Sequence, residues 1–181
     1  MPSDMLFSLI LLGVTAPLCV GFLAFFVGSD RISNRLVQFL FLASSLLGGL
    51  GTVGVLHKLL TGAMQATILT IPGIPFTATL DVWSAFFLLL IHGGVCLASL
   101  FALGYLPKYK HVYSFDSLNL ATALFVFGMQ ATVLASSVFV FLFFWEVMSV
   151  AAYFLVIADR EEASLKAGFI YFAMTHLGVA C

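Results

Sequence analysis

The sequence predicts an all-α membrane protein, a polytopic bundle of five full transmembrane helices followed by the start of a sixth. Of the 181 residues, 62% are hydrophobic and only 8% are charged, against roughly 25% charged in an average soluble domain. The apolar residues are grouped into stretches that reach the ~20 residues a helix needs to cross a bilayer. A soluble fold of this length could not bury so much apolar surface, so the expected solvent is lipid.

The first two spans are expected at Met5–Val27 and Leu36–Leu56. The N-terminus has no positive charge, and the first apolar stretch exceeds the 7–15 residues typical of a signal-peptide core. We therefore expect the first span to remain in the protein. Four glycines in the second span suit close contact between helices: Gly48, Gly49, Gly51 and Gly54.

The third span is expected at Val82–Leu106, with Asp81 before it and Pro107 after it. Asp81 is a candidate N-cap, because a carboxylate there accepts hydrogen bonds from amides of the first helical turn. The preceding segment, Thr61–Leu80, contains prolines and glycines and then alternates apolar residues with threonines. This pattern predicts an ordered surface loop with a short strand.

The fourth and fifth spans are expected at Leu118–Leu134 and Val138–Ala158. Together they lie in a run of 42 residues, Ser117 to Ala158, in which Glu146 is the only Asp, Glu, Lys or Arg. As one helix this run would be about 63 Å long, twice the thickness of the hydrocarbon core. It must fold back, and the best turn is Ala135-Ser136-Ser137.

A sixth span starts near Leu165, after the polar segment Asp159–Ser164. The residues that follow Lys166 would cover roughly 22 Å as a helix, short of the ~30 Å core. We therefore expect this sequence to be the front part of a longer protein.

The loop cations predict the orientation. The odd-numbered loops carry five Lys or Arg, and the even-numbered loops carry one. By the positive-inside rule, the odd loops are cytoplasmic and the N-terminus lies outside. The five are Arg31, Arg35, Lys108, Lys110 and Arg160, and the single one is Lys58.

Glu146 is the strongest candidate functional residue. A charged side chain at the middle of a membrane helix costs roughly 2.5–3.5 kcal/mol even on the mildest scale. Its carboxyl must therefore be protonated, paired with a cation, or placed beside water, and these are the conditions under which a carboxyl can carry protons. Ser149 and Tyr153 are expected on its helix face. The alternative is a neutral Glu that hydrogen-bonds a neighbouring helix.

Two further residues are candidates for a proton pathway. Lys166 is either an interfacial lysine whose amine reaches the membrane surface or a proton-entry residue at the mouth of a cavity. His176 lies about ten residues deeper and could relay protons, since an imidazole titrates near neutrality. A structural histidine is the competing interpretation.

The remaining polar residues indicate no cofactor or metal. His92 is expected to be structural, and Gln130 to form an interhelical hydrogen bond. His92 and His176 could in principle ligate a haem, but two-haem cytochromes need two histidines on each of two helices. The cysteines Cys19, Cys96 and Cys181 lack metal-site spacing, and the net charge of −1 argues against a nucleic-acid partner.

Several motifs together resemble a known family. They include Trp145-Glu146 within Phe143–Ser149, the segment Ala163-Ser-Leu-Lys-Ala167, the segment Thr175-His-Leu-Gly178, and Asp81-Val-Trp-Ser84. The sequence is similar to the antiporter-like membrane subunits shared by respiratory complex I (NADH dehydrogenase), the multi-subunit sodium/proton antiporters and the membrane-bound nickel–iron hydrogenases. Gly168–Gly178 looks closest to the hydrogenase-4 and formate-hydrogenlyase branch.

The resemblance implies part of a larger antiporter-like fold with two inverted repeats. Residues 1–110 would hold the first three helices, and residues 111–181 would begin the first repeat with helices four to six. Glu146 matches the family's fifth-helix Glu, whose partner is a Lys on a seventh helix beyond Cys181. Lys166 matches a sixth-helix basic position.

The function implied is a proton-translocating subunit of a membrane-bound oxidoreductase complex in the cell's inner membrane. Its partners would be other membrane subunits and a peripheral redox arm, with the lipid bilayer around it. Glu146, Lys166 and His176 would form the proton pathway, without any cofactor or metal. The alternatives are a structural membrane anchor for a soluble redox module and a sodium/proton antiporter subunit.

Overall fold

The computed structural model describes residues 3–28, 34–61, 66–71, 76–109 and 112–180. Its elements are, in chain order, α1 (Ser3–Val27), α2 (Asn34–Leu60), β1 (Ala66–Ile71), β2 (Phe76–Leu80), α3 (Val82–Tyr105), the 3₁₀-helix η1 (Leu106–Tyr109), α4 (Phe115–Leu134), α5 (Val138–Val156) and α6 (Glu162–Ala180). The prediction of an all-α membrane bundle is confirmed. Within the described residues, five helices are long and apolar enough to cross a membrane, and they are α1 to α5.

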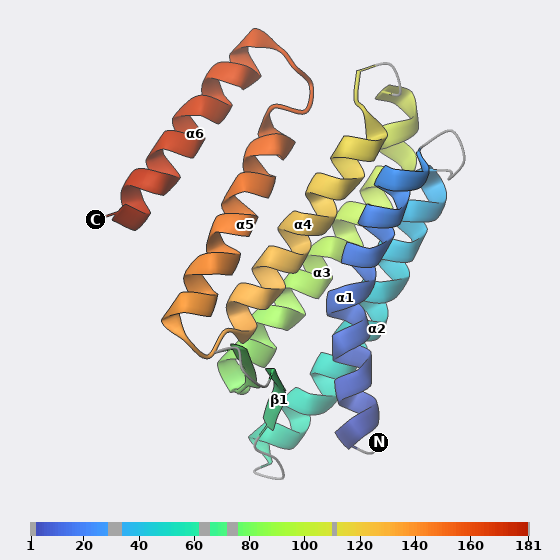
Figure 1. Ribbon diagram of the computed structural model, residues 1–181. Helices are drawn as coiled ribbons and strands as arrows, with labels where there is room; N and C mark the ends of the chain where they lie inside the picture. The colour runs from blue at the N-terminus through green and yellow to red at the C-terminus, as the bar shows by residue number, and fades with distance from the viewer. Residues whose placement is uncertain (1–2, 29–33, 62–65, 72–75, 110–111, 181) are drawn as a thin grey trace.

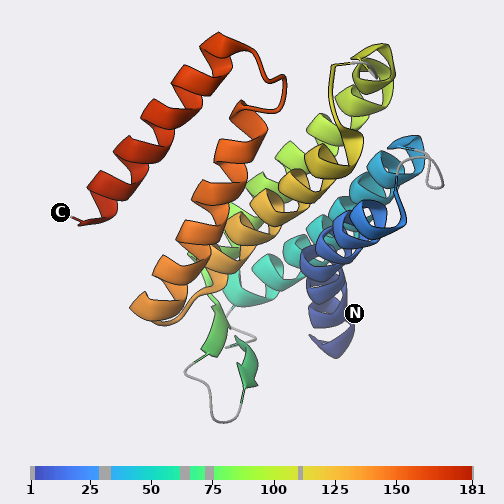
Figure 2. The same ribbon diagram turned by 45° about the horizontal axis from the view of Figure 1, so that its top comes forward.

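Helices α1 to α4 form a bundle, α5 packs along α4, and α6 packs along α5 on the outside (Figures 1 and 2). The helices present many large apolar side chains outward, such as Leu97 and Phe101 on α3, which are 71% and 66% exposed. Such a surface is typical of a helix bundle that packs against lipid or other membrane helices.

The connections alternate between the two ends of the bundle. The N-terminus, the β-hairpin and the α4–α5 turn lie at one end, and the α1–α2, α3–α4 and α5–α6 connections lie at the other (Figure 1). Arg35, Lys108 and Arg160 lie toward the second end, at or beside those connections. Arg31 and Lys110, the other two cations of the odd-numbered loops, lie outside the described residues.

The expected short strand is present, and it pairs with a second one. Strands β1 and β2 form an antiparallel hairpin with a register irregularity between Thr67 and Leu69. An isolated β-bridge joins Ala78 of β2 to Ala135. Ala135 lies in the predicted turn between α4 and α5, and Ser137 caps α5 by accepting a hydrogen bond from the Val140 amide. The hairpin thus covers the turn that reverses the chain.

Asp81 is the N-cap of α3, as the sequence predicts. Its backbone is extended, and its Oδ1 accepts a hydrogen bond of 2.7 Å from the Ser84 amide. That hydrogen bond favours the carboxylate form and lowers the pKa of Asp81. A lowered pKa in the folded state means that the carboxylate contributes stability at neutral pH.

We expect Asp81→Ala to lower the free energy of unfolding by about 1 kcal/mol at neutral pH, the usual value of an N-cap. Because the folded-state pKa is below the unfolded one, this difference is present above the unfolded pKa and disappears as pH falls through the folded pKa. Unfolding in mixed detergent micelles across a pH series measures it. Asp81→Asn is the control, because it caps the helix without titrating; a wild-type stability unchanged by acid relative to this variant would contradict the expectation.

The centre of the α1–α4 bundle holds a polar side chain among glycines. His92 of α3 is 1% exposed, and its ring lies against Gly48 of α2 and Gly13 of α1. Its Nδ1 lies 3.4 Å from Nε2 of Gln130 on α4. This contact confirms the interhelical role expected of Gln130. His92 therefore lies where the four helices meet.

Candidate functional site

Glu146 lies midway along α5, and the structure places a histidine opposite it. Oε2 of Glu146 is 2.9 Å from Nε2 of His176 on α6. The two side chains are 39% and 35% exposed, respectively. Helices α5 and α6 are joined by the short connection Ile157–Glu161 and run antiparallel, so the middle of α5 lies beside the second half of α6.

Two other contacts align α6 with α5. The rings of Tyr153 and Phe172 meet edge-on with centroids 5.5 Å apart. Gly168 is buried against Ile157 and Tyr153, and a Cβ at this position would clash with the Ile157 side chain. A small residue is required there because the two helices approach closely. These contacts set the register that brings His176 to the depth of Glu146.

The imidazole of His176 is held by its own helix. Its Nδ1 lies 2.8 Å from the carbonyl oxygen of Phe172, one turn earlier. Its ring also stacks on the Phe172 ring, with centroids 4.0 Å apart and planes tilted by 33°. The ring therefore has a fixed orientation, with Nε2 directed at Glu146.

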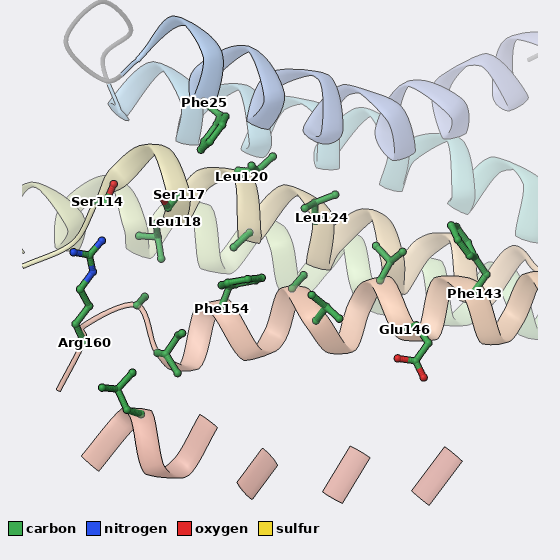
Figure 3. Close-up of a pocket in the computed structure, with 17 residues that line it drawn as sticks. Phe25, Ser114, Ser117, Leu118, Leu120, Leu124, Phe143, Glu146, Phe154 and Arg160 are labelled. Carbon is green, nitrogen blue, oxygen red and sulfur yellow. The ribbon is translucent and has the colours of Figure 1, made fainter. Parts of the chain in front are cut away.

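Glu146 also borders a groove with a volume of about 1060 Å³, formed mainly by α4 and α5. In Figure 3, Glu146 and Phe143 lie near one end of the groove, and Arg160, Ser114 and Ser117 lie at the other. The walls between them are apolar, including Leu118, Leu124, Val150 and Phe154. A carboxyl in such surroundings interacts strongly with any charge near it, because little water screens the interaction.

Lys166 is not part of this cluster. It lies in the first turns of α6, ten residues before His176, where its amine is 2.8 Å from Oε1 of Glu162. Both side chains are largely exposed, at 73% and 83%. Exposed ion pairs of this kind stabilise by at most about 1 kcal/mol. The structure therefore brings Glu146 and His176 together and leaves Lys166 at the end of the helix.

Ser149 and Tyr153, which were expected on the same helix face as Glu146, face different parts of the molecule. Tyr153 faces α6, on the same side as the Glu146–His176 contact. Ser149 is 2% exposed and faces the interior of the bundle, and no described hydrogen bond joins it to Glu146. Trp145 stacks on Phe141, and Met148 lies against Gly128 of α4.

The two histidines considered as a haem pair do not share a site. His92 is enclosed by α1, α2 and α4, whereas His176 contacts Glu146 at the α5–α6 interface. Among the residues that the structure describes, no group of three or more His, Cys, Asp or Glu could hold a metal ion.

The chain is similar to two known proteins, although no family model matches it. It is 29% identical over 157 residues to Hydrogenase-4 component B of Escherichia coli (strain K12), which covers 85% of this chain and 23% of that protein. Its fold matches a chain of the membrane-bound sulfane sulfur reductase (MBS), an archaeal respiratory membrane complex. The TM-score is 0.77 at 18% identity, over 94% of this chain and 34% of that one.

The sequence similarity is thus to a hydrogenase component, and the similarity of fold is to a chain of an archaeal respiratory membrane complex. The structural match establishes a common fold over 94% of this chain. The chain spans about a quarter of the length of the curated relative it matches.

Proposed function

We propose that this chain is part of a proton-translocating membrane subunit of a respiratory or hydrogenase-type complex. The observation that carries the proposal is the contact between Glu146 and His176 beside an apolar groove at the middle of a membrane helix. Intramembrane ionisable residues are rare, and they commonly mark proton relays when they face one another. The similarity to Hydrogenase-4 component B supports a hydrogenase-type complex as the assembly to which the chain belongs.

Glu146 and His176 act as the central pair of this pathway. Two opposite charges about 4 Å apart at an effective dielectric near 20 interact by about 4 kcal/mol. A change of charge nearby can therefore move a proton onto or off the pair without a metal or cofactor. Lys166 belongs to the cytoplasmic end of the pathway, where an exposed amine can attract and exchange protons with water.

The full protein would continue beyond these 181 residues, since the relative is about four times as long. Further helices would complete the repeat that begins at residue 111, and other membrane subunits and a peripheral redox arm would supply the driving reaction. The complex would lie in the cell's inner membrane with this N-terminus outside.

Inverted membrane vesicles that contain the assembled complex test this proposal. Electron transfer should acidify the vesicle lumen, as reported by a pH-sensitive dye. Removing the subunit should abolish the acidification attributable to it while the remaining subunits still transfer electrons. A structural anchor predicts the opposite pattern, with electron transfer lost together with assembly.

The orientation has a separate test. We expect a cysteine at position 108 to react with an impermeant maleimide only after the cell membrane is opened, and a cysteine at position 61 to react in intact cells. Both positions are exposed, at opposite ends of the bundle. The variants Lys108→Cys and Thr61→Cys are made without the native Cys19, Cys96 and Cys181. Labelling of position 108 in intact cells would reverse the assigned orientation.

A further inference from the structure

We propose that Glu146 and His176 form a site that takes a single proton and excludes Na⁺, with His176 as the residue that sets this selectivity. The inference rests on the proposed proton-translocating function, and it assigns to His176 the discrimination between H⁺ and Na⁺. The supporting observations are the hydrogen-bonding partners of the nitrogen and oxygen atoms in the two side chains.

The proton count follows from the histidine's contacts. A carbonyl oxygen can only accept, so the 2.8 Å contact with Phe172 requires a proton on Nδ1. The 2.9 Å contact between Nε2 and Oε2 then holds one further proton. That proton sits on Nε2 as an imidazolium facing a carboxylate, or on Oε2 as a carboxylic acid facing a neutral ring. The pair thus shares one exchangeable proton.

Without the shared proton, the contact becomes unfavourable. A carboxylate oxygen would then face the lone pair of Nε2 at hydrogen-bonding distance, because Phe172 keeps the other proton on Nδ1. The ring is also held by stacking on Phe172. Loss of the proton therefore requires either a new cation at Glu146 or a movement of the imidazole.

Na⁺ is a poor replacement for this proton. Hard metal cations bind through several oxygen ligands, as carboxylates, carbonyls and waters. Glu146 supplies two oxygens, and Nε2 of His176 already occupies one of them. The residues that line the groove next to Glu146 are Phe143, Val147 and Val150, which have no side-chain oxygen.

The nearby hydroxyl does not complete a cation site. The Thr175 hydroxyl donates to the carbonyl oxygens of Tyr171 and Phe172 and lies 3.4 Å from Nδ1, on the side of the ring away from Glu146. A proton needs one lone pair, which the carboxylate or the ring provides. The described ligand set therefore suits a proton.

The other charged or titratable groups around the pair are few. Tyr153 of α5 packs on Phe172, Lys166 is paired with Glu162 at the start of α6, and Arg160 lies at the far end of the groove. From α4, the groove is lined near this region by Ala121 and Leu124, which carry no charge. Within the described residues, His176 is accordingly the ionisable group that contacts Glu146.

Carbodiimide labelling tests the selectivity. Hydrophobic carbodiimides react with a protonated carboxyl in an apolar site, and mass spectrometry of the complete complex in lipid nanodiscs locates the product. We expect Glu146 to be labelled in the wild-type complex. At fixed pH, the rate should be the same in NaCl as in choline chloride of equal ionic strength. Protection by Na⁺ in the wild type would overturn the inference.

The variant His176→Gln tests the role of the histidine. Its amide oxygen can serve as a ligand, so Na⁺ should now slow the labelling of Glu146 severalfold. If this variant, folded as judged by gel filtration and circular dichroism, ignores Na⁺ as the wild type does, His176 does not set the selectivity. Glu162→Gln is the matched control, since its carboxyl is exposed and far from the pair, and it should leave the labelling unchanged.

Failure of this inference and failure of the proposed function give different results. Na⁺ protection of Glu146 with normal acidification of vesicles would overturn the selectivity assigned to this site and leave proton transport in place. Absence of acidification in vesicles with Na⁺-insensitive labelling would overturn the transport function and leave the proton site.

Discussion

Replacing Glu146 with glutamine is expected to reduce proton pumping by the complete complex to less than about a tenth of the wild-type rate, which corresponds to about 1.4 kcal/mol or more in the barrier. Glutamine keeps the shape of the side chain and can still hydrogen-bond Nε2 of His176, which is 2.9 Å from Oε2 in the wild type. It cannot become a carboxylate, so it cannot hold or release the shared proton. The measurement is the rate of acidification of inverted vesicles during electron transfer.

Glu162→Gln is the control for this experiment. It removes a carboxyl of the same type on the neighbouring helix, where it pairs with Lys166 and is 83% exposed. Its effect on pumping should be small. Assembly of the complex should be normal in both variants, as measured by co-purification. Unchanged pumping in the Glu146→Gln complex would rule out the proton pathway and favour the structural anchor.

The largest effect on stability is expected from Gly48→Ala. A Cβ at this position would lie 2.5 Å from Cε1 and 2.8 Å from Nε2 of His92, and 2.8 Å from the Cα of Gly13. The Gly13 backbone cannot move aside without shifting α1, and His92 is enclosed on all sides by helices. We expect the free energy of unfolding to fall by about 1–3 kcal/mol, the usual cost of overpacking a core. The midpoint of unfolding by SDS in mixed micelles measures it.

The next residue along the same helix provides the matched control. A Cβ at Gly49 would lie 3.6 Å from the Cβ of His92, an ordinary contact. Gly49→Ala should therefore be neutral or stabilising by up to about 1 kcal/mol, because alanine favours a helix over glycine. Equal stability of the Gly48 and Gly49 variants would show that α1, α2 and α3 do not meet as closely as described.

The membrane spans could be predicted because the hydrocarbon core fixes their length and forbids charges inside it. The run from Ser117 to Ala158 was too long for one helix, and this identified the turn at Ala135. The N-cap at Asp81 could also be predicted, because it depends only on this side chain and the amides of the next helical turn. The pairing of β1 with β2 was missed, because the alternation in the sequence covers mainly the second strand.

The partner of Glu146 was not predicted, although both members of the pair were named. The family resemblance directed attention to a lysine on a later helix, whereas the structure places His176 opposite Glu146. Glu146 is 10 residues before the end of α5 at Val156, whereas His176 is 14 residues after the start of α6 at Glu162, so equal counts from the connection do not identify the pair. The contact depends on how α6 packs along α5, which periodicity within one helix does not specify.

The sequence locates the polar residues of the first helices, but it does not predict which of them hydrogen-bond to one another. Asn119 of α4 bonds both Gln38 and Asn34 of α2. These helices are not consecutive, so their relative height depends on how the whole bundle packs. Periodicity within one helix carries no information about that height.

The bridge between Ala78 and Ala135 joins the segments that lead into two helices of the molecule. Strand β2 leads through Asp81 directly into α3, which carries His92, and the bridged turn leads directly into α5, which carries Glu146. A displacement of α5 along its axis would therefore pull on the hairpin and through it on the first turn of α3. The hairpin would thus couple the helix of the buried His92 to the helix of the partly exposed Glu146 along the backbone.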